Sequence, residues 1–169
     1  MDWPLGEPIA TERLILEPVG VAHADSMVAV LAEPSLYEFT GGLAPTLDTL
    51  RSRYADQVVG HSADGTEGWF NWIIMPRATG DPAGFVQATL TRENSVLVAE
   101  LAWVVTPAWQ RQRIASEATR VMVDWLQSKG VGHFVAHIHS EHHPSMSVAR
   151  NLGLQPTSVE KDGEVRWEG

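Results

Sequence analysis

The sequence of 169 residues contains no cysteine. Disulfides, thiolate metal sites and a cysteine nucleophile are therefore excluded, and the composition suits a reducing compartment. No apolar run approaches the ~20 residues that a membrane-spanning helix needs. The first residues have neither the basic nor the apolar stretch of a secretion signal. We therefore expect a cytoplasmic protein with no membrane partner.

Basic residues are also scarce. Twelve lysines and arginines stand against 21 aspartates and glutamates, which gives a formal net charge of −9. Neutralising phosphates requires a basic face, so the balance argues against a nucleic-acid partner. An amine-bearing substrate suits an acidic protein better. The length favours one domain over residues 1–169.

The order of the apolar patterns predicts a mixed α/β fold. Alternation predicts strands over 13–18, 69–75, 83–91, 96–105, 133–138, 154–160 and 164–167, and helical spacing predicts helices over 24–31, 47–58, 116–129 and 144–152. Thr46 is a suitable N-cap for the second helix, and Pro144 suits a first helical turn. The strand–helix–strand crossover makes 96–105 and 133–138 a parallel pair. Ligands in such sheets favour the carboxyl ends of the parallel strands.

The segment after residue 105 carries the clearest chemical signal. It leaves an apolar strand and enters a helix, whose N-terminus is an anion site because its N–H groups are unpaired. Arg111 and Arg113 stand just before that helix, where cations oppose the helix dipole unless an anion lies between them. The charge pattern alone is equally consistent with two solvated surface arginines.

Family resemblance favours the anion site. Gln110-Arg111-Gln112-Arg113-Ile114-Ala115 resembles the pyrophosphate loop of GNAT N-acetyltransferases, Gln/Arg-x-x-Gly-x-Gly/Ala. Further segments are similar, in the same order, to the Rim-type branch of ribosomal-protein N-terminal acetyltransferases: Thr11–Leu16, Ala99–Trp103 and Ser145–Leu154. The resemblance implies the GNAT fold, a mixed, mostly antiparallel sheet with a central parallel pair splayed at the CoA site and about four flanking helices. It also implies an acyl-CoA-dependent N-acyltransferase that uses acetyl-CoA and a primary amine acceptor in a ternary complex.

The same resemblance supplies the expected cofactor-binding residues. They are Trp103, Val104, Val105, Gln110, Arg111, Gln112, Arg113, Ile114, Ala115, Ser116, His142 and Ser145. His142 stands where the family commonly has an asparagine, and Arg113 replaces its central glycine. With a negative φ, Arg113 fits and pairs with a CoA phosphate; the alternative is that its side chain blocks the loop. A non-catalytic GNAT-fold module that binds CoA or a partner is therefore the alternative interpretation.

Two residues are candidates for the catalytic proton transfers. Glu100 is the only charge in the apolar strand 96–105, and burial would raise the pKa of its carboxyl group, which suits a general base. The alternative is a glutamate that faces solvent or pairs with an arginine. Ser145 is implied by the resemblance as the proton donor to the CoA thiolate. Its alternative role is local hydrogen bonding in a first helical turn.

Aromatic residues suggest where an acceptor would lie. The chain has seven tryptophans, and Tyr37, Phe39, Trp72 and Trp103 together would wall an apolar acceptor slot. Each of them singly is more typical of core packing. The acceptor itself stays open between a protein N-terminus and a small amine, as does an acyl group longer than acetyl. Many relatives dimerise, so a homodimer is an open prediction too.

Histidines crowd residues 133–143, and imidazole is a common metal ligand. His137 and His139 share one strand face, so two ligands are geometrically feasible. The spacing fits no zinc motif, and we expect no metal. A metal-dependent hydrolase is the weaker alternative.

Overall fold

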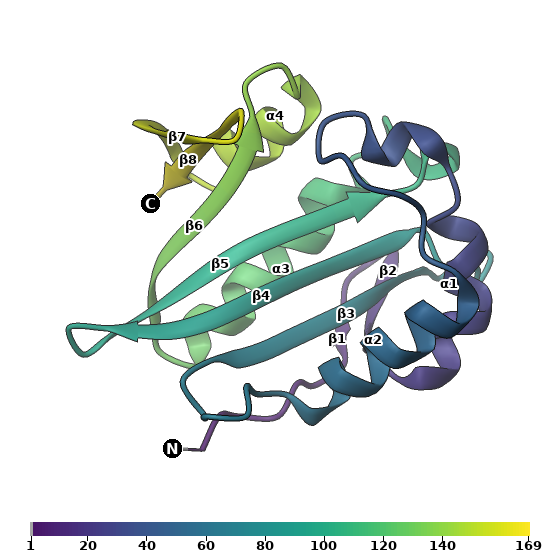
Figure 1. The fold of residues 1–169 in the computed structure, drawn as a ribbon, viewed down its shortest axis with the longest axis horizontal. Coiled ribbons are helices and arrows are strands. Elements are labelled where there is room, and N and C mark those ends of the chain that lie inside the picture. The colour runs from purple at the N-terminus through teal and green to yellow at the C-terminus, as the bar shows by residue number, and fades with distance from the viewer. Residues whose placement is uncertain (1) are drawn as a thin grey trace.

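The strands of residues 2–169 form one eight-stranded sheet in this computed structural model (Figure 1). Its order is β1-β2-β3-β4-β5-β6-β8-β7, and every pair is antiparallel except β5 with β6. The strands are β1 (Ile9–Ala10), β2 (Leu14–Pro18), β3 (Gly68–Pro76), β4 (Gly84–Glu93), β5 (Val96–Val105), β6 (Val131–His139), β7 (Gln155–Lys161) and β8 (Glu164–Glu168). The predicted mixed sheet with one central parallel pair is confirmed.

The α-helices of the described chain are α1 (Ala24–Val30), α2 (Leu47–Val59), α3 (Ile114–Ser128) and α4 (His143–Asn151). Thr46 caps α2 as predicted, because its Oγ1 accepts a hydrogen bond of 3.1 Å from the Thr49 N–H. The prediction for α3 was wrong at its start, since the helix begins at Ile114 rather than at residue 116. The short strand β1 was not predicted.

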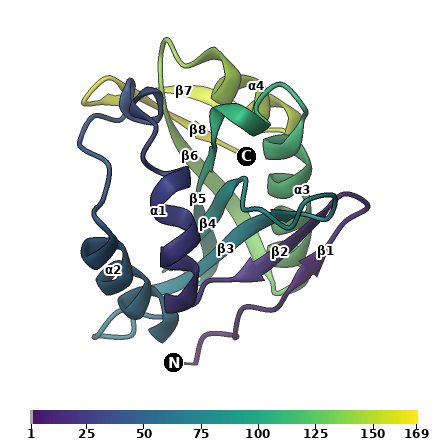
Figure 2. The ribbon, with the colours of Figure 1, turned by 90° about the vertical axis from the view of Figure 1, so that its right-hand side faces the viewer.

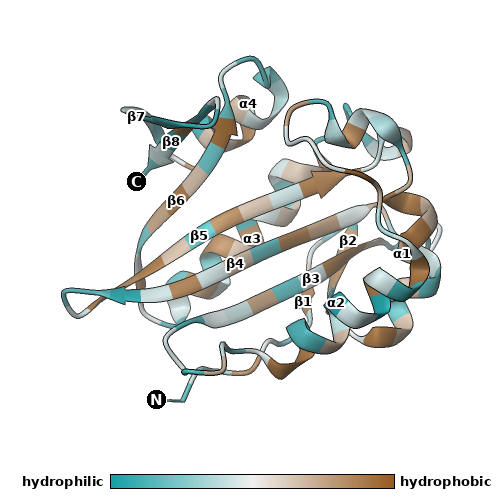
Figure 3. Ribbon diagram, in the orientation of Figure 1, coloured by the Kyte–Doolittle hydropathy of each residue, from teal (hydrophilic) through white to brown (hydrophobic). Residues whose placement is uncertain are grey.

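The helices cover the two faces of the sheet. Phe70, Trp72 and Ile74 alternate along β3 into the main core, which α3 covers, while Ile73 packs into a second core under α1 and α2. Figure 2 shows α3 and the α1–α2 pair on opposite sides of the sheet, and Figure 3 shows the apolar strand residues between them. Successive strand residues point to opposite faces, so each strand supplies both cores.

The central parallel strands separate part of the way along. Their pairing runs from Leu97↔Val131 to Leu101↔Ala136, the last pair within residues 2–169, although β5 continues to Val105. Strand β6 instead keeps its ladder with β8 on the other side. The last residues of β5 therefore lack a strand partner on that side, and the predicted splay is confirmed (Figure 1).

Gly84 fixes where β5 ends. It pairs with Val105 at the last position of the β4–β5 ladder, and the Thr106 N–H donates to the Ala83 carbonyl oxygen at 2.8 Å. Its φ is +154°, and a Cβ there would lie 1.9 Å from the Val104 carbonyl oxygen. Only glycine allows this approach, because any side chain would push the two backbones apart.

Gly84→Ala should lower the free energy of unfolding by about 3 kcal/mol, since it adds a steric clash to a strained backbone conformation. Gly132→Ala is the matched control in β6, two strands away, where a Cβ would meet only the Val96 Cγ1 at 3.6 Å. We expect the control to change stability by less than about 0.5 kcal/mol. Urea unfolding of both variants measures this, and equal effects would contradict the steric explanation.

Candidate active site

The loop between β5 and α3 adopts the backbone conformation that glycine favours. Arg111 and Arg113 have φ of +62° and +61°. The negative φ that would let an arginine fit without strain is therefore absent at Arg113. Left-handed conformations cost an ordinary residue about 1–2 kcal/mol. The loop thus keeps a glycine-like path without a glycine, and both arginine side chains are exposed.

The first turn of α3 presents its N–H groups to this loop. Arg113 is the N-cap residue, and no side chain in residues 2–169 makes a capping hydrogen bond there. The N–H groups of a first helical turn have no partner within the helix, and together with the helix dipole they attract an anion. The predicted residues from Gln110 to Ser116 therefore form one loop and an uncapped helix start, and their binding of CoA stays a prediction.

The N-terminal segment that resembles the family anchors this loop. The Arg13 guanidinium donates to Glu117 Oε1 at 2.8 Å and to the Gln112 carbonyl oxygen at 2.9 Å. Glu117 Oε2 accepts a hydrogen bond of 2.5 Å from Thr11. At the other end, the Gln110 side-chain amide donates to the Val105 carbonyl oxygen at 2.9 Å. The loop is thus tied to the segment between β1 and β2, to α3 and to the end of β5.

Glu117 is charged in this arrangement. Partial burial raises the pKa of its carboxyl group, but hydrogen bonds from Thr11 and Arg13 and the charge of Arg13 together lower the pKa below its usual value. A carboxylate with a lowered pKa contributes stability that is present at neutral pH and is lost as the pH falls through its folded-state pKa. The anchor of the loop therefore weakens only in acid.

Glu100 lies beside the splay but is not buried. Its side chain is 59% exposed, and Oε1 lies 2.9 Å from His137 Nδ1 across the β5–β6 pair. The expected burial of this carboxylate was wrong, and its partner is a histidine rather than an arginine. Leu101 points into the main core, so Glu100 lies on the opposite face, which α1 and α2 cover only in part (Figure 1).

A small aromatic cluster closes the end of the splay. Phe39, from the segment between α1 and α2, stacks on His142 with ring centroids 4.7 Å apart and lies 5.2 Å from His139. Burial and the charge of His139 lower the pKa of His142, although Glu38 opposes them. His142 is therefore neutral at neutral pH. Its Nε2 lies 3.5 Å from Ser145 Oγ, so the predicted Phe39, His142 and Ser145 are brought together.

The other predicted aromatic residues do not join this cluster. Trp72 has no exposed surface and packs in the main core, where its indole N–H donates to the Glu7 carbonyl oxygen. Trp72 also lines a small cavity between α2 and the sheet, so its part in an acceptor slot stays a prediction. Trp103 packs against the same core, on the face opposite Glu100. The Tyr37 hydroxyl donates to the Leu31 carbonyl oxygen at 2.6 Å and so holds the α1–α2 connection.

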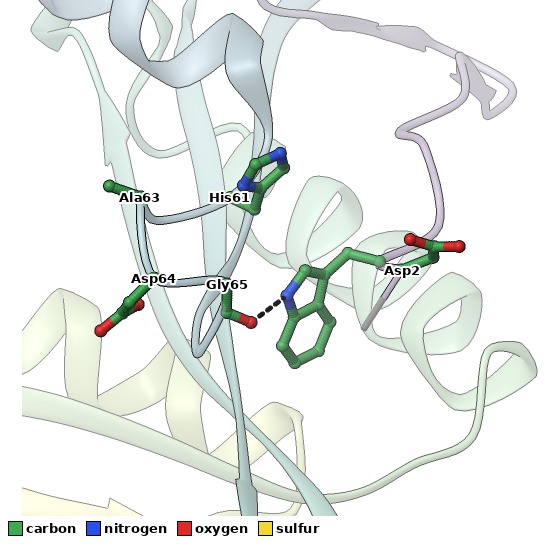
Figure 4. Close-up of a pocket in the computed structure, with 6 residues that line it drawn as sticks. Asp2, His61, Ala63, Asp64 and Gly65 are labelled. Atoms are coloured by element: carbon green, nitrogen blue, oxygen red, sulfur yellow. Dashed lines mark hydrogen bonds between the residues drawn. The ribbon is translucent and has the colours of Figure 1, made fainter.

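A hollow near the N-terminal segment takes no part in this site. It has a volume of about 410 Å³ and lies between Trp3 and the loop 61–65, where the Trp3 indole N–H donates to the Gly65 carbonyl oxygen (Figure 4). Gly68, beside that loop, pairs with Leu90, whereas the candidate site adjoins Gly84 at the other end of β4. The hollow is therefore separated from the site by most of a strand.

The histidine cluster is dispersed over separate contacts. His133 lies 3.8 Å from Glu168, and His139 Nδ1 accepts a hydrogen bond from the Glu141 N–H. In the described part of the chain, no three His, Asp or Glu side chains are grouped so that they could hold a metal ion. Nor does any helix between residues 2 and 169 have the length and apolarity to cross a membrane.

Solved structures share this fold. A putative GNAT-family acetyltransferase from Bordetella pertussis is 23% identical with a TM-score of 0.71, covering 96% of this chain and 98% of its own. RimL, a ribosomal L7/L12 α-N-protein acetyltransferase solved with coenzyme A, is 14% identical with a TM-score of 0.76, covering 96% and 97%. An acetyltransferase from Salmonella typhimurium that modifies the N-terminal serine of L7/L12 is 13% identical with a TM-score of 0.76, covering 96% and 98%. No curated protein sequence matches the chain.

A family model provides the assignment that these low identities cannot. The model is described as an acetyltransferase (GNAT) domain, and it matches residues 13–155. The match spans β2, the loop after β5, α3 and α4, the elements that build the site described above. The chain therefore belongs to the GNAT acetyltransferase family.

Proposed function

We propose that this protein transfers an acetyl group from acetyl-CoA to a primary amine by direct attack in a ternary complex. The observation that carries this is the splay of β5 from β6, with the uncapped start of α3 at the end of β5. The loop would hold the pyrophosphate through its N–H groups, with Arg111 and Arg113 pairing with phosphates. The main chain of Trp103, Val104 and Val105, which has no strand partner on the β6 side, would take the pantetheine arm. We expect the reaction in the cytoplasm, which the lack of cysteine suits.

The geometry suggests roles for the groups around the splay. The amine nitrogen attacks the thioester carbonyl carbon, and a main-chain N–H of β5 stabilises the oxyanion. Glu100, directly or through water, accepts the proton that the amine loses. The C–S bond then breaks, and Ser145, which neighbours neutral His142, donates a proton to the departing thiolate and regains one from water. Phe39 would exclude solvent from this end of the splay.

Calorimetric titration with acetyl-CoA tests the proposal, with desulfo-CoA and ATP as controls. We expect dissociation constants of about 1–100 μM for both CoA compounds and much weaker binding of ATP. The protein has no cysteine, so a thiol reagent reports only the CoA released when candidate amines are added. Binding without release for any amine would indicate a non-catalytic CoA-binding module, and absence of CoA binding would refute the proposal.

Arg113→Gly separates the backbone role of this position from its charge. The substitution removes the left-handed strain, so the free energy of unfolding should rise by about 1 kcal/mol. It also removes a phosphate partner, so acetyl-CoA affinity should fall about three- to tenfold. Arg113→Lys keeps both the charge and the Cβ and should change neither quantity greatly. An increase in affinity with Arg113→Gly would show instead that the arginine obstructs the loop.

Glu100→Gln tests the general base. The rate constant kcat should fall about 100-fold because the amine loses its proton acceptor, while the Kd for acetyl-CoA stays unchanged. Glu93→Gln is the matched control, since it removes the same charge from the exposed β4–β5 hairpin. Steady-state kinetics on the first amine found active measures both. A kcat for Glu100→Gln equal to that of the control would exclude Glu100 as the base.

A further inference from the structure

A small cavity lies between α2 and the sheet, on the same sheet face as Glu100. Its volume is about 50 Å³, and its polar lining comes from three elements: Arg53, Tyr54 and Gln57 on α2, Asn71 on β3 and Gln87 on β4. Val86 and Ala88 point into the main core, so Gln87 between them points to the opposite face. The cavity therefore lies on the side of the sheet where an acceptor would approach Glu100.

Tyr54 is the least satisfied group in this cavity. The residue is only 4% exposed, and its hydroxyl has no hydrogen-bond partner within residues 2–169. Burial raises its pKa to about 12, although the charge of Arg53 lowers it. The hydroxyl therefore stays protonated and can donate. Buried hydroxyl groups in native proteins are nearly always paired, so an orphan one that lines a cavity indicates a missing partner.

The other polar groups of the cavity also lack protein partners. No side-chain hydrogen bond or ion pair joins Arg53, Gln57, Asn71 or Gln87 to any residue of the described chain. Arg51, two residues before Arg53 on α2, instead donates a hydrogen bond of 2.9 Å to Asp25. The lining contains no carboxylate, and its hydroxyl, amides and guanidinium all offer N–H or O–H donors. Such a set is complementary to an anionic oxygen acceptor.

The register places this cavity within reach of the splay. Asn71 pairs with Gln87, and Gln87 pairs with Ala102. Ala102 directly follows Leu101, the last residue of β5 that pairs with β6 among the residues described. Strands lie about 4.8 Å apart, so Asn71 is about 10 Å from β5 across the sheet. One small molecule can therefore span from the cavity to the reactive edge.

We propose that this cavity binds a carboxylate group of the acceptor, so that the substrate is an amine that carries a carboxylate several bonds away. The inference rests on the proposed function, because it takes the splay as the place where the amine reacts. Arg53 supplies the positive charge, and the Tyr54 hydroxyl and the amides supply directed hydrogen bonds. A bidentate guanidinium–carboxylate contact favours this geometry over a simple amine.

The probes are matched amines that differ only in the carboxylate. γ-Aminobutyrate is compared with n-butylamine, and ε-aminocaproate with n-hexylamine, each added to the desulfo-CoA complex of the full chain, which has no acyl group to transfer. The readout is the chemical shift of the side-chain amides of Gln57, Asn71 and Gln87 in NMR spectra, which needs no turnover. We expect at least one amino acid to shift these signals at about 1–10 mM and to bind at least about tenfold more tightly than its matched amine.

Substitutions locate the effect in the cavity. Arg53→Gln and Tyr54→Phe should each weaken binding of the amino acid about tenfold and leave binding of the alkylamine and of acetyl-CoA unchanged. Arg51→Gln removes the same charge from the same helix outside the cavity and should have no effect. Tyr54→Phe removes a hydroxyl without a partner, so its Tm should not fall.

Each other outcome overturns the inference. Equal shifts from an amino acid and its matched amine would exclude carboxylate recognition, and absence of shifts from every probe would mean that the cavity holds only water. If acetyl-CoA still binds in that case, the proposed function stands while this inference fails. If acetyl-CoA does not bind, both fail together.

Discussion

Strands β5 and β6 exchange hydrogen bonds only as far as Leu101 and Ala136, and the described part of β6 beyond that point is held by β8. Strand β5 keeps its pairing with the antiparallel strand β4 as far as Val105. Strand β6 separates from β5 before that point. The result is an open main-chain edge inside the sheet. Unpaired backbone groups in such a place call for a partner. The CoA arm proposed here would be that partner, and the loop, Glu100 and the Phe39–His142 stack are all placed around this edge.

The loop that follows β5 has a strained backbone at Arg111 and Arg113. Two left-handed arginines within three residues cost more than the glycines that commonly occupy such positions. The loop is held by contacts from outside itself. Arg13 bonds to both Glu117 and the Gln112 carbonyl oxygen. Residues 11–16 resemble the family, although the sequence alone does not show why. The structure gives the reason, because Arg13 in this segment anchors the loop. Strained backbone of this kind persists where the surroundings determine it, often at ligand sites.

Periodicity predicted most of the fold, because both cores are apolar and regular. The limits of β5 were predicted to the residue, and Thr46 was identified as the cap of α2. Side-chain environment was less accessible. Glu100 stands in an apolar strand, yet it is exposed because no helix covers that part of the face. Trp72 was by itself more typical of core packing than of a slot, and its ring contacts with Phe70 and Trp125 place it in the core.

The hydrogen-bond donors around Tyr54 are a second example of a side-chain environment that the sequence does not reveal. Tyr54 lies in the helix predicted over residues 47–58 and is buried there, but a sequence cannot show that its hydroxyl is left without a partner. Asn71 and Gln87 gave a weak signal, as polar residues that interrupt apolar strands. The protein carries a net charge of −9, so its overall field attracts amines and repels anions. A carboxylate would bind only where local hydrogen-bond donors outweigh that field. An acceptor with an amine and a carboxylate would place the amine near Glu100 and the carboxylate near Arg53. The arrangement therefore favours zwitterions over simple amines or simple acids.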